Sequence, residues 1–381
     1  MAKRRLVFIG AVVIFFFSAG LFSKPAIIYF AEKQIEKTFP HSSVSVGGCG
    51  FLPLGTFSLN DIRIVNRPVL DVAVKSISFR YSPASLIKAT LTRISVADAV
   101  LTIQLPDKSI GELRRFVAAG ASAPVVKIEK LEVINARCAI TAKEAALKAA
   151  LSASFDMKTA TLESCELAID SLEAGAAALQ ACALAVKNNA GPGNFSVKKI
   201  TFQNAALREI GGRPRLIDNA LVFDDLSGEF LGGKVLAQGA LSLAGGFSYE
   251  LNVVFTALDL DRFVRDFKLT EKLALAGNIS GPLSLKGSGG RLGKIRGNLS
   301  ADKGGQLTIK DDTYLKGIAQ NSGQSLDIIV ESFNNYHYNT GDIAVSLDEG
   351  NLVFTIALEG QAGKRQLSVV LHDVIITQEE E

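Results

Sequence analysis

The sequence is poor in several residue types that often mark catalytic sites or tightly packed helices. It contains no Trp, 2 Met, 3 His, 4 Cys and 10 Pro in 381 residues, whereas Gly occurs 34 times. Few prolines and many glycines suit a chain of many strands joined by tight turns better than a helical bundle. The composition therefore favours a mainly β fold.

The sequence also lacks a strong excess of charge of either sign. It has 41 Lys and Arg against 38 Asp and Glu, and the basic residues are spread along the chain. A protein that binds nucleic acid usually gathers basic residues in a patch or stripe. No such patch is visible, so we expect no nucleic-acid partner.

Histidine and cysteine give no recognisable site. His41, His337 and His372 have no acid or nucleophile at a catalytic spacing. The cysteines contain no C-x-x-C pair, so they match no zinc motif. They are Cys49, Cys138, Cys165 and Cys182. Cys165 and Cys182 could meet on neighbouring strands, although small buried residues are the commoner reading. We predict no catalytic residue, no metal and no cofactor, and therefore no enzyme.

One stretch imitates a phosphate-binding loop. Residues 228–235 read GEFLGGKV, with the G-x-x-x-x-G-K spacing, but Val235 stands where the motif needs a magnesium-binding hydroxyl. Strand-like residues flank it on both sides, so we predict a hairpin turn. The adjacent pairs Asp224–Asp225 and Asp311–Asp312 would point to opposite faces of a strand and are interpreted as turn residues.

Long apolar runs are absent except at the N-terminus. Residues from Leu6 to Phe22 carry no charge, and Lys3, Arg4 and Arg5 precede them. This predicts a single transmembrane anchor at residues 6–22, with residues 1–5 in the cytoplasm and the main body in the periplasm. A cleavable signal peptide is the alternative, but the run is longer than the usual signal core. Residues 23–40 continue as a predicted juxtamembrane helix.

The remainder reads as alternating strands with short helical insertions. A capping box at Ser109 predicts one helix before a linker near residue 120, and the sequence DLDRFVRDF predicts another from Asp259 to Phe267. Residues 142–190 are rich in Ala, which favours helix by propensity, yet their alternation favours strands. We predict strands there. The acidic end, residues 377–381, is predicted to be a disordered tail.

The clearest alternation places apolar side chains on one face of two strands. These candidate lining residues are Phe247, Tyr249, Leu251, Val253 and Phe255, and Leu352, Phe354, Ile356 and Leu358. Two folds agree with about 20 such strands. A sandwich would bury the apolar faces against each other, whereas a long curled sheet would leave them lining an open groove for an acyl chain. Periodicity does not separate the two.

Several segments resemble the AsmA-like family of envelope proteins, whose relatives include TamB and YdbH. The resemblance covers the N-terminal anchor, residues 50–64 and residues 72–105 at one end of the body. At the other end it covers residues 226–239, residues 275–309 and the YdbH-type stretch 333–360. We therefore predict an N-terminal region at 44–120, an Ala-rich middle region at 125–222, and a C-terminal AsmA/YdbH-like region at 223–376.

This resemblance implies an elongated, curled antiparallel β-sheet behind the transmembrane helix, with an apolar groove that conducts phospholipid between membranes. The expected ligand is a phospholipid or another acyl chain, and the expected location is the inner membrane. About 20 strands at ~4.8 Å each would give a body near 100 Å, so a further envelope protein could complete the bridge. The alternative function is a structural or adhesive envelope protein of stacked β-sandwiches without a lipid.

Overall fold

The computed structural model describes residues 24–38, 42–105, 127–310 and 333–371, with single positions between 316 and 330. Short gaps inside these ranges fall at 53–54, 67–68, 83, 86–87, 89, 144, 203, 245–246, 290, 302 and 349. The predicted anchor at 6–22, the capping-box helix after Ser109, and the acidic tail lie outside the described residues. Among those described, no helix combines the length and apolarity needed to cross a bilayer.

The described chain is mainly β, as predicted, with 23 strands and two helices. Its contacts divide it into two units. Unit 1 comprises the residues up to Gly175 together with residues 180–188. Unit 2 comprises residues 176–179 and the residues from Asn189 onward. The division falls within the middle region expected from the sequence.

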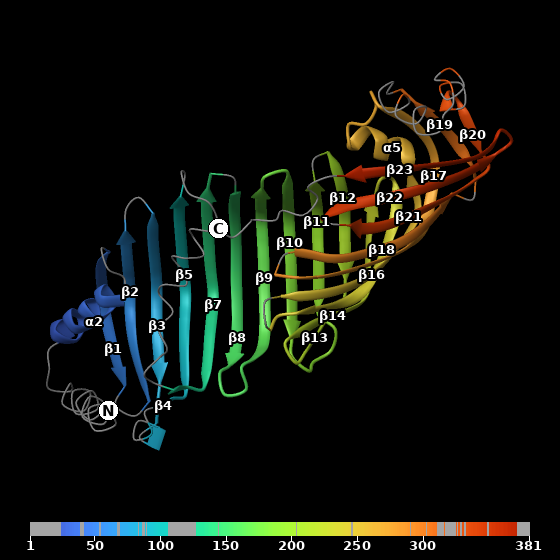
Figure 1. The fold of residues 1–381 in the computed structure, drawn as a ribbon. Coiled ribbons are helices and arrows are strands. Elements are labelled where there is room, and N and C mark those ends of the chain that lie inside the picture. The colour runs from blue at the N-terminus through green and yellow to red at the C-terminus, as the bar shows by residue number, and fades with distance from the viewer. Residues whose placement is uncertain are drawn as a thin grey trace. The chain divides into compact units, whose positions relative to one another are not determined.

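Unit 1 is a sheet of long strands that lie side by side (Figure 1). Its main strands are β1 (Ser43–Leu52), β2 (Thr56–Asn66), β3 (Leu70–Arg80), β5 (Arg93–Leu105), β7 (Lys130–Ala142), β8 (Ala145–Asp156) and β9 (Thr161–Ala174), and β10 (Ala177–Lys187) pairs with β9. β8 to β10 come from the Ala-rich segment 142–190, so the prediction of strands there is confirmed. The Ala residues of this segment favour helix by propensity, but pairing of each strand with a neighbouring strand stabilises the extended conformation instead.

One junction in unit 1 departs from the expected antiparallel sheet. β5 and β7 are parallel, with Ile94 opposite Leu131 and Leu105 opposite Ala142. The two-residue strands β4 (Thr90–Leu91) and β6 (Lys127–Ile128) are parallel as well. Parallel neighbours cannot be joined by a tight hairpin, and residues 106–126 separate β5 from β6 in the sequence. The alternation within one strand carries no sign of its neighbour's direction, so the sequence could not show this reversal.

Helix α2 (Lys24–Thr38) packs on the first strands of unit 1, and it confirms the helix predicted within residues 23–40. That this helix adjoins a membrane stays a prediction. Ile27 is buried in an apolar cluster with Val46, Phe57 and Ile62. The Glu32 carboxylate accepts a 2.9 Å hydrogen bond from the backbone N–H of Val46 on β1. Among the described strands β1 pairs only with β2, so α2 protects one of its edge donors.

The strands of unit 2 are antiparallel, and β14 to β18 and β21 to β23 pair in that order. The first strands are β11 (Asn194–Phe202), β12 (Ala205–Gly212), β13 (Arg215–Ile217), β14 (Ala220–Phe230), β15 (Gly233–Ser242) and β16 (Ser248–Asp259). The remaining strands are β17 (Leu273–Ser288), β18 (Arg291–Ala301), β19 (Gly305–Ile309), β20 (Tyr336–Tyr338), β21 (Thr340–Asp348), β22 (Asn351–Gly360) and β23 (Gly363–Leu371).

Part of the unit 2 sheet is covered by its own chain. The first half of β17 pairs with β19, which pairs with β20. These strands and helix α5 (Leu260–Asp266) contribute to one buried apolar cluster with β18 and β21 to β23. Asp259 is the N-cap of α5, because its side chain accepts from the backbone N–H groups of Asp261 and Arg262. The predicted helix is therefore confirmed.

Candidate functional site

The apolar side chains of unit 1 line up from strand to strand. In three rows every residue is in register with the next across β1, β2, β3, β5, β7, β8 and β9. The rows are Val44, Ile64, Val72, Leu101, Cys138, Ala149, Ile169; Cys49, Leu59, Ile77, Val96, Val133, Ala153, Cys165; and Phe51, Phe57, Phe79, Ile94, Leu131, Phe155, Leu162. We call this surface the apolar face of unit 1.

The rows run across the strands and are long compared with a lipid tail. Six spacings of about 4.8 Å between seven strands give a length of about 29 Å. The hydrocarbon of one bilayer leaflet is about 15 Å thick, half of the usual core. In the middle of the unit the row side chains Val96, Leu101, Val133 and Cys138 are half-buried, and Leu151, on the same face of β8, is 36% exposed. On β2 the row residues Phe57, Leu59 and Ile64 are buried, so the apolar surface that an extended chain can reach is the middle of the face.

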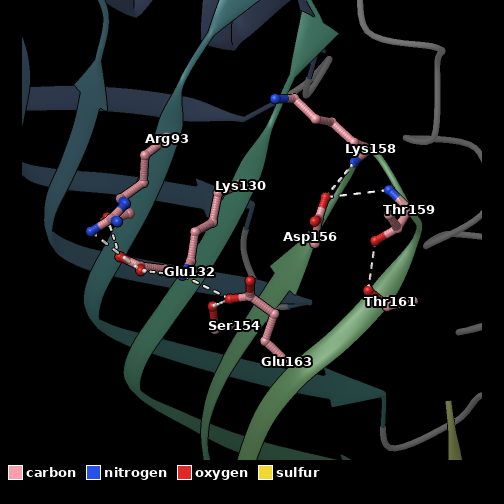
Figure 2. Close-up of polar contacts among 10 residues, drawn as sticks. Arg93, Lys130, Glu132, Ser154, Asp156, Lys158, Thr159, Thr161 and Glu163 are labelled. Carbon is pink, nitrogen blue, oxygen red and sulfur yellow. Dashed lines mark hydrogen bonds and ion pairs between the residues drawn. The ribbon is translucent and has the colours of Figure 1, made fainter. Parts of the chain in front are cut away.

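The opposite face of unit 1 carries polar residues that join the strands (Figure 2). Glu132 on β7 accepts from Ser95 on β5 at 3.0 Å and lies 3.4 Å from the guanidinium of Arg93. Lys130 on β7 lies 2.7 Å from Glu163 on β9, and Ser154 on β8 donates to the same carboxylate at 2.8 Å. This polar ladder spans the parallel junction between β5 and β7.

Hydrogen bonding in the ladder shifts two pKa values. The bond to Glu163 raises the pKa of Lys130, and that bond together with the one from Ser154 lowers the pKa of Glu163. Near the end of the ladder the carboxylate of Asp156 accepts from the backbone N–H groups of Lys158 and Thr159, which lowers its pKa (Figure 2). Each ion therefore has a structural partner, and the arrangement gives no poised acid or base.

All four cysteines are free thiols, and three of them lie in the apolar rows. Burial raises the pKa of Cys138, Cys165 and Cys182, which keeps them protonated and poorly reactive. The reading of Cys165 and Cys182 as small buried residues fits this structure better than a disulfide. No group of His, Cys, Asp or Glu within the described ranges could hold a metal ion.

Unit 2 has an apolar row of the same kind. It crosses β14 to β23 through Leu226, Ala237, Val253, Leu283, Gly297, Val345, Phe354 and Val369. Here the sheet face is partly closed. An apolar cavity of about 70 Å³ lies beneath α5, and its walls include Leu260, Phe263, Phe354, Ile356 and Leu358. A cavity of ~150 Å³ holds one benzene molecule, so this space is too small for an acyl chain as it stands.

The structure places the candidate lining residues as follows. Tyr249, Leu251, Val253 and Phe255 share a face of β16, with Val253 buried. Leu352, Phe354, Ile356 and Leu358 belong to β22, and all four lie in or against the apolar cluster under α5. Phe247 differs, because it precedes β16 at φ +57° and is 59% exposed. That these residues line a lipid groove stays a prediction.

The remaining sequence motifs within the described residues are structural, and the pair Asp311–Asp312 lies outside those residues. Leu231 and Gly232 form the tight turn between β14 and β15 with positive φ, so the phosphate-loop imitation is a hairpin as predicted. Asp224 and Asp225 lie at a bulge within β14, not in a turn, and they bind Arg215 and the backbone N–H of Arg213. Their placement in the strand corrects the expected turn. His337 is exposed on β20 between two buried tyrosines.

Sequence reasoning missed the apolar face of unit 1 as a candidate site. The alternation of Ile77 and Phe79 is visible in the sequence, but their alignment with Val96 or Val133 depends on register. A bulge at Asn135, which has positive φ, shifts the register between β7 and β8 by one residue. No simple sequence signal marks this bulge in advance.

The fold and the rows define a class of protein: β-sheet proteins with a continuous apolar face that crosses many strands. A family model, YdbH-like and described as the intermembrane phospholipid transport protein YdbH, matches residues 130–371. Since this is more than half of the 381 residues, the chain belongs to the YdbH-like family. The expected AsmA-like relationship is confirmed. The family is described by lipid transport and not by a reaction. The search of curated proteins gave no match.

Proposed function

We propose that this protein carries phospholipid, or another lipid with acyl chains, along the apolar face of unit 1. The observation that supports the proposal most is the register of the three rows, which align apolar side chains across seven strands while leaving the central ones half-exposed. Exposed apolar surface of this extent usually serves a ligand or partner. Membership of the YdbH-like family supports a lipid as that ligand.

The proposal includes a location. Residues 6–22 would anchor the chain in the inner membrane with its N-terminus in the cytoplasm, and the β units would lie in the periplasm. The uncharged run after Lys3, Arg4 and Arg5 supports this orientation. A further envelope protein would complete the path between membranes.

A second function is favoured for unit 2 by a specific observation. Its sheet face under α5 is packed, with Phe263 in edge contact with Phe354 at 6.4 Å between ring centroids. This is the packing expected of a structural β core, as in the alternative of a structural envelope protein. We therefore assign lipid handling to unit 1 first.

The test is to purify the full-length protein in mild detergent and identify bound lipids by mass spectrometry after extraction. We expect phospholipid at a fixed ratio to protein. A chain that is fully folded and free of lipid after incubation with phospholipid vesicles would refute the proposal.

A further inference from the structure

Helix α2 presents an aromatic and charged surface away from the sheet. Tyr29 is 63% exposed, whereas Ile27, about 200° around the helix from it, is 7% exposed, and Phe30 at the side of this surface is 44% exposed. The ammonium of Lys33 lies 5.9 Å from the centroid of the Tyr29 ring and 2.7 Å from the carboxylate of Glu36. Tyrosine and lysine are residues that prefer the level of lipid headgroups.

The helix cannot turn this surface inward. Its other side is fixed to unit 1 by the packing of Ile27 and Ile35 against the sheet cluster and by the bond from Val46 to Glu32. The orientation of Tyr29 and Phe30 therefore follows from the packing of α2.

The position of α2 in the chain brings this surface close to the apolar run. The run ends at Phe22 and α2 begins at Lys24. Two Cα steps of about 3.8 Å allow at most about 7.6 Å between them. If residues 6–22 are anchored in a membrane, the start of α2 therefore lies close to that membrane.

We propose that the outer surface of α2, formed by Tyr29, Phe30 and Lys33, lies in the headgroup layer of a phospholipid bilayer. This inference rests on the proposed anchor at residues 6–22. It makes α2 an interfacial helix, with the aromatic rings below the headgroups and the ammonium among the phosphates. β1, which packs against α2, is then the strand of unit 1 nearest to the membrane surface.

The absence of Trp from the chain allows a direct test with single-tryptophan variants. Full-length Tyr29→Trp, Met157→Trp and Phe16→Trp are each incorporated into vesicles of phosphatidylethanolamine and phosphatidylglycerol. The vesicles carry spin labels either near the headgroup or deep in the acyl chains. Met157 is the matched control, because it is 44% exposed in the turn after β8 of the same unit. Phe16 reports separately on the anchor.

We expect the spin label near the headgroup to quench the fluorescence of Trp at position 29. We also expect the emission of this Trp to shift to shorter wavelength when the protein is incorporated into vesicles. Fluorescence at position 157 should respond only to a quencher in water. If position 16 is quenched by the deep label while position 29 behaves like position 157, the inference is overturned and the anchor stands. Quenching at 29 without quenching at 16 would support the interfacial helix and refute the anchor. Quenching at neither position would refute both.

Discussion

The substitution Leu151→Glu tests whether the apolar face of unit 1 contacts lipid. Leu151 lies on that face of β8, opposite Ala136 and Leu167, and it is 36% exposed. A glutamate there can keep contact with water in the lipid-free protein, so we expect the unfolding free energy to fall by only about 1 kcal/mol. An acyl chain laid over it would bury the charge, which costs several kcal/mol. Taking about 3 kcal/mol, the affinity for lipid should fall about 100-fold.

The assay measures bound phospholipid per protein by mass spectrometry and the unfolding midpoint in urea. Val100→Glu is the matched control, because Val100 is 44% exposed on β5 and its register neighbours are Ala73 and Arg137. Its side chain points to the polar face, so lipid content should be unchanged. Normal lipid content in Leu151→Glu, with the protein folded, would show that lipid does not lie on this face. Equal loss in both variants would point to a general effect of added charge.

Three further predictions concern stability. Phe354→Ala should lower the unfolding free energy of unit 2 by about 3 kcal/mol, because it empties part of the cluster under α5, and an unchanged urea midpoint would contradict that packing. The pKa of Glu163 is lowered from its usual 4.5, so its stabilising effect is present at neutral pH and lost as pH falls through the folded pKa. Glu163→Gln should therefore be less stable than the wild type at pH 7 and equal to it at pH 2, whereas a constant difference would refute the ion pair. Glu32→Ala should speed hydrogen exchange at the Val46 amide, with a cost of about 1–3 kcal/mol, while Glu32→Gln retains an acceptor and should exchange more slowly than the alanine variant.

Much of the fold could be predicted from individual strands. The alternation in segments such as 248–255 and 352–358 identifies a strand and its apolar face, because side chains alternate with period 2 whatever the neighbour is. The capping residue Asp259 similarly marks the start of α5. These signals are local, and the structure agrees with them.

Other features depend on contacts between distant residues. The parallel pairing of β5 with β7 and the covering of β22 by α5 involve no local pattern. Phe354 illustrates the consequence: its alternation agrees with an open groove and with a packed core, and only the contact with Phe263 from another element distinguishes them. The alternation predicts lining residues in unit 2, whereas the more exposed aligned rows belong to unit 1.

The parallel junction between β5 and β7 also bears on how unit 1 folds. β1 to β5 can form by successive local turns, and so can β7 to β9, because each strand follows its partner in the chain. Joining the two blocks requires closure of the segment 106–126, which is slower since more chain entropy is lost before the contacts form. The ion pair between Arg93 on β5 and Glu132 on β7 then links the block β1 to β5 with the block β7 to β9. Hydrogen exchange during refolding should show protection within each block before protection across this boundary.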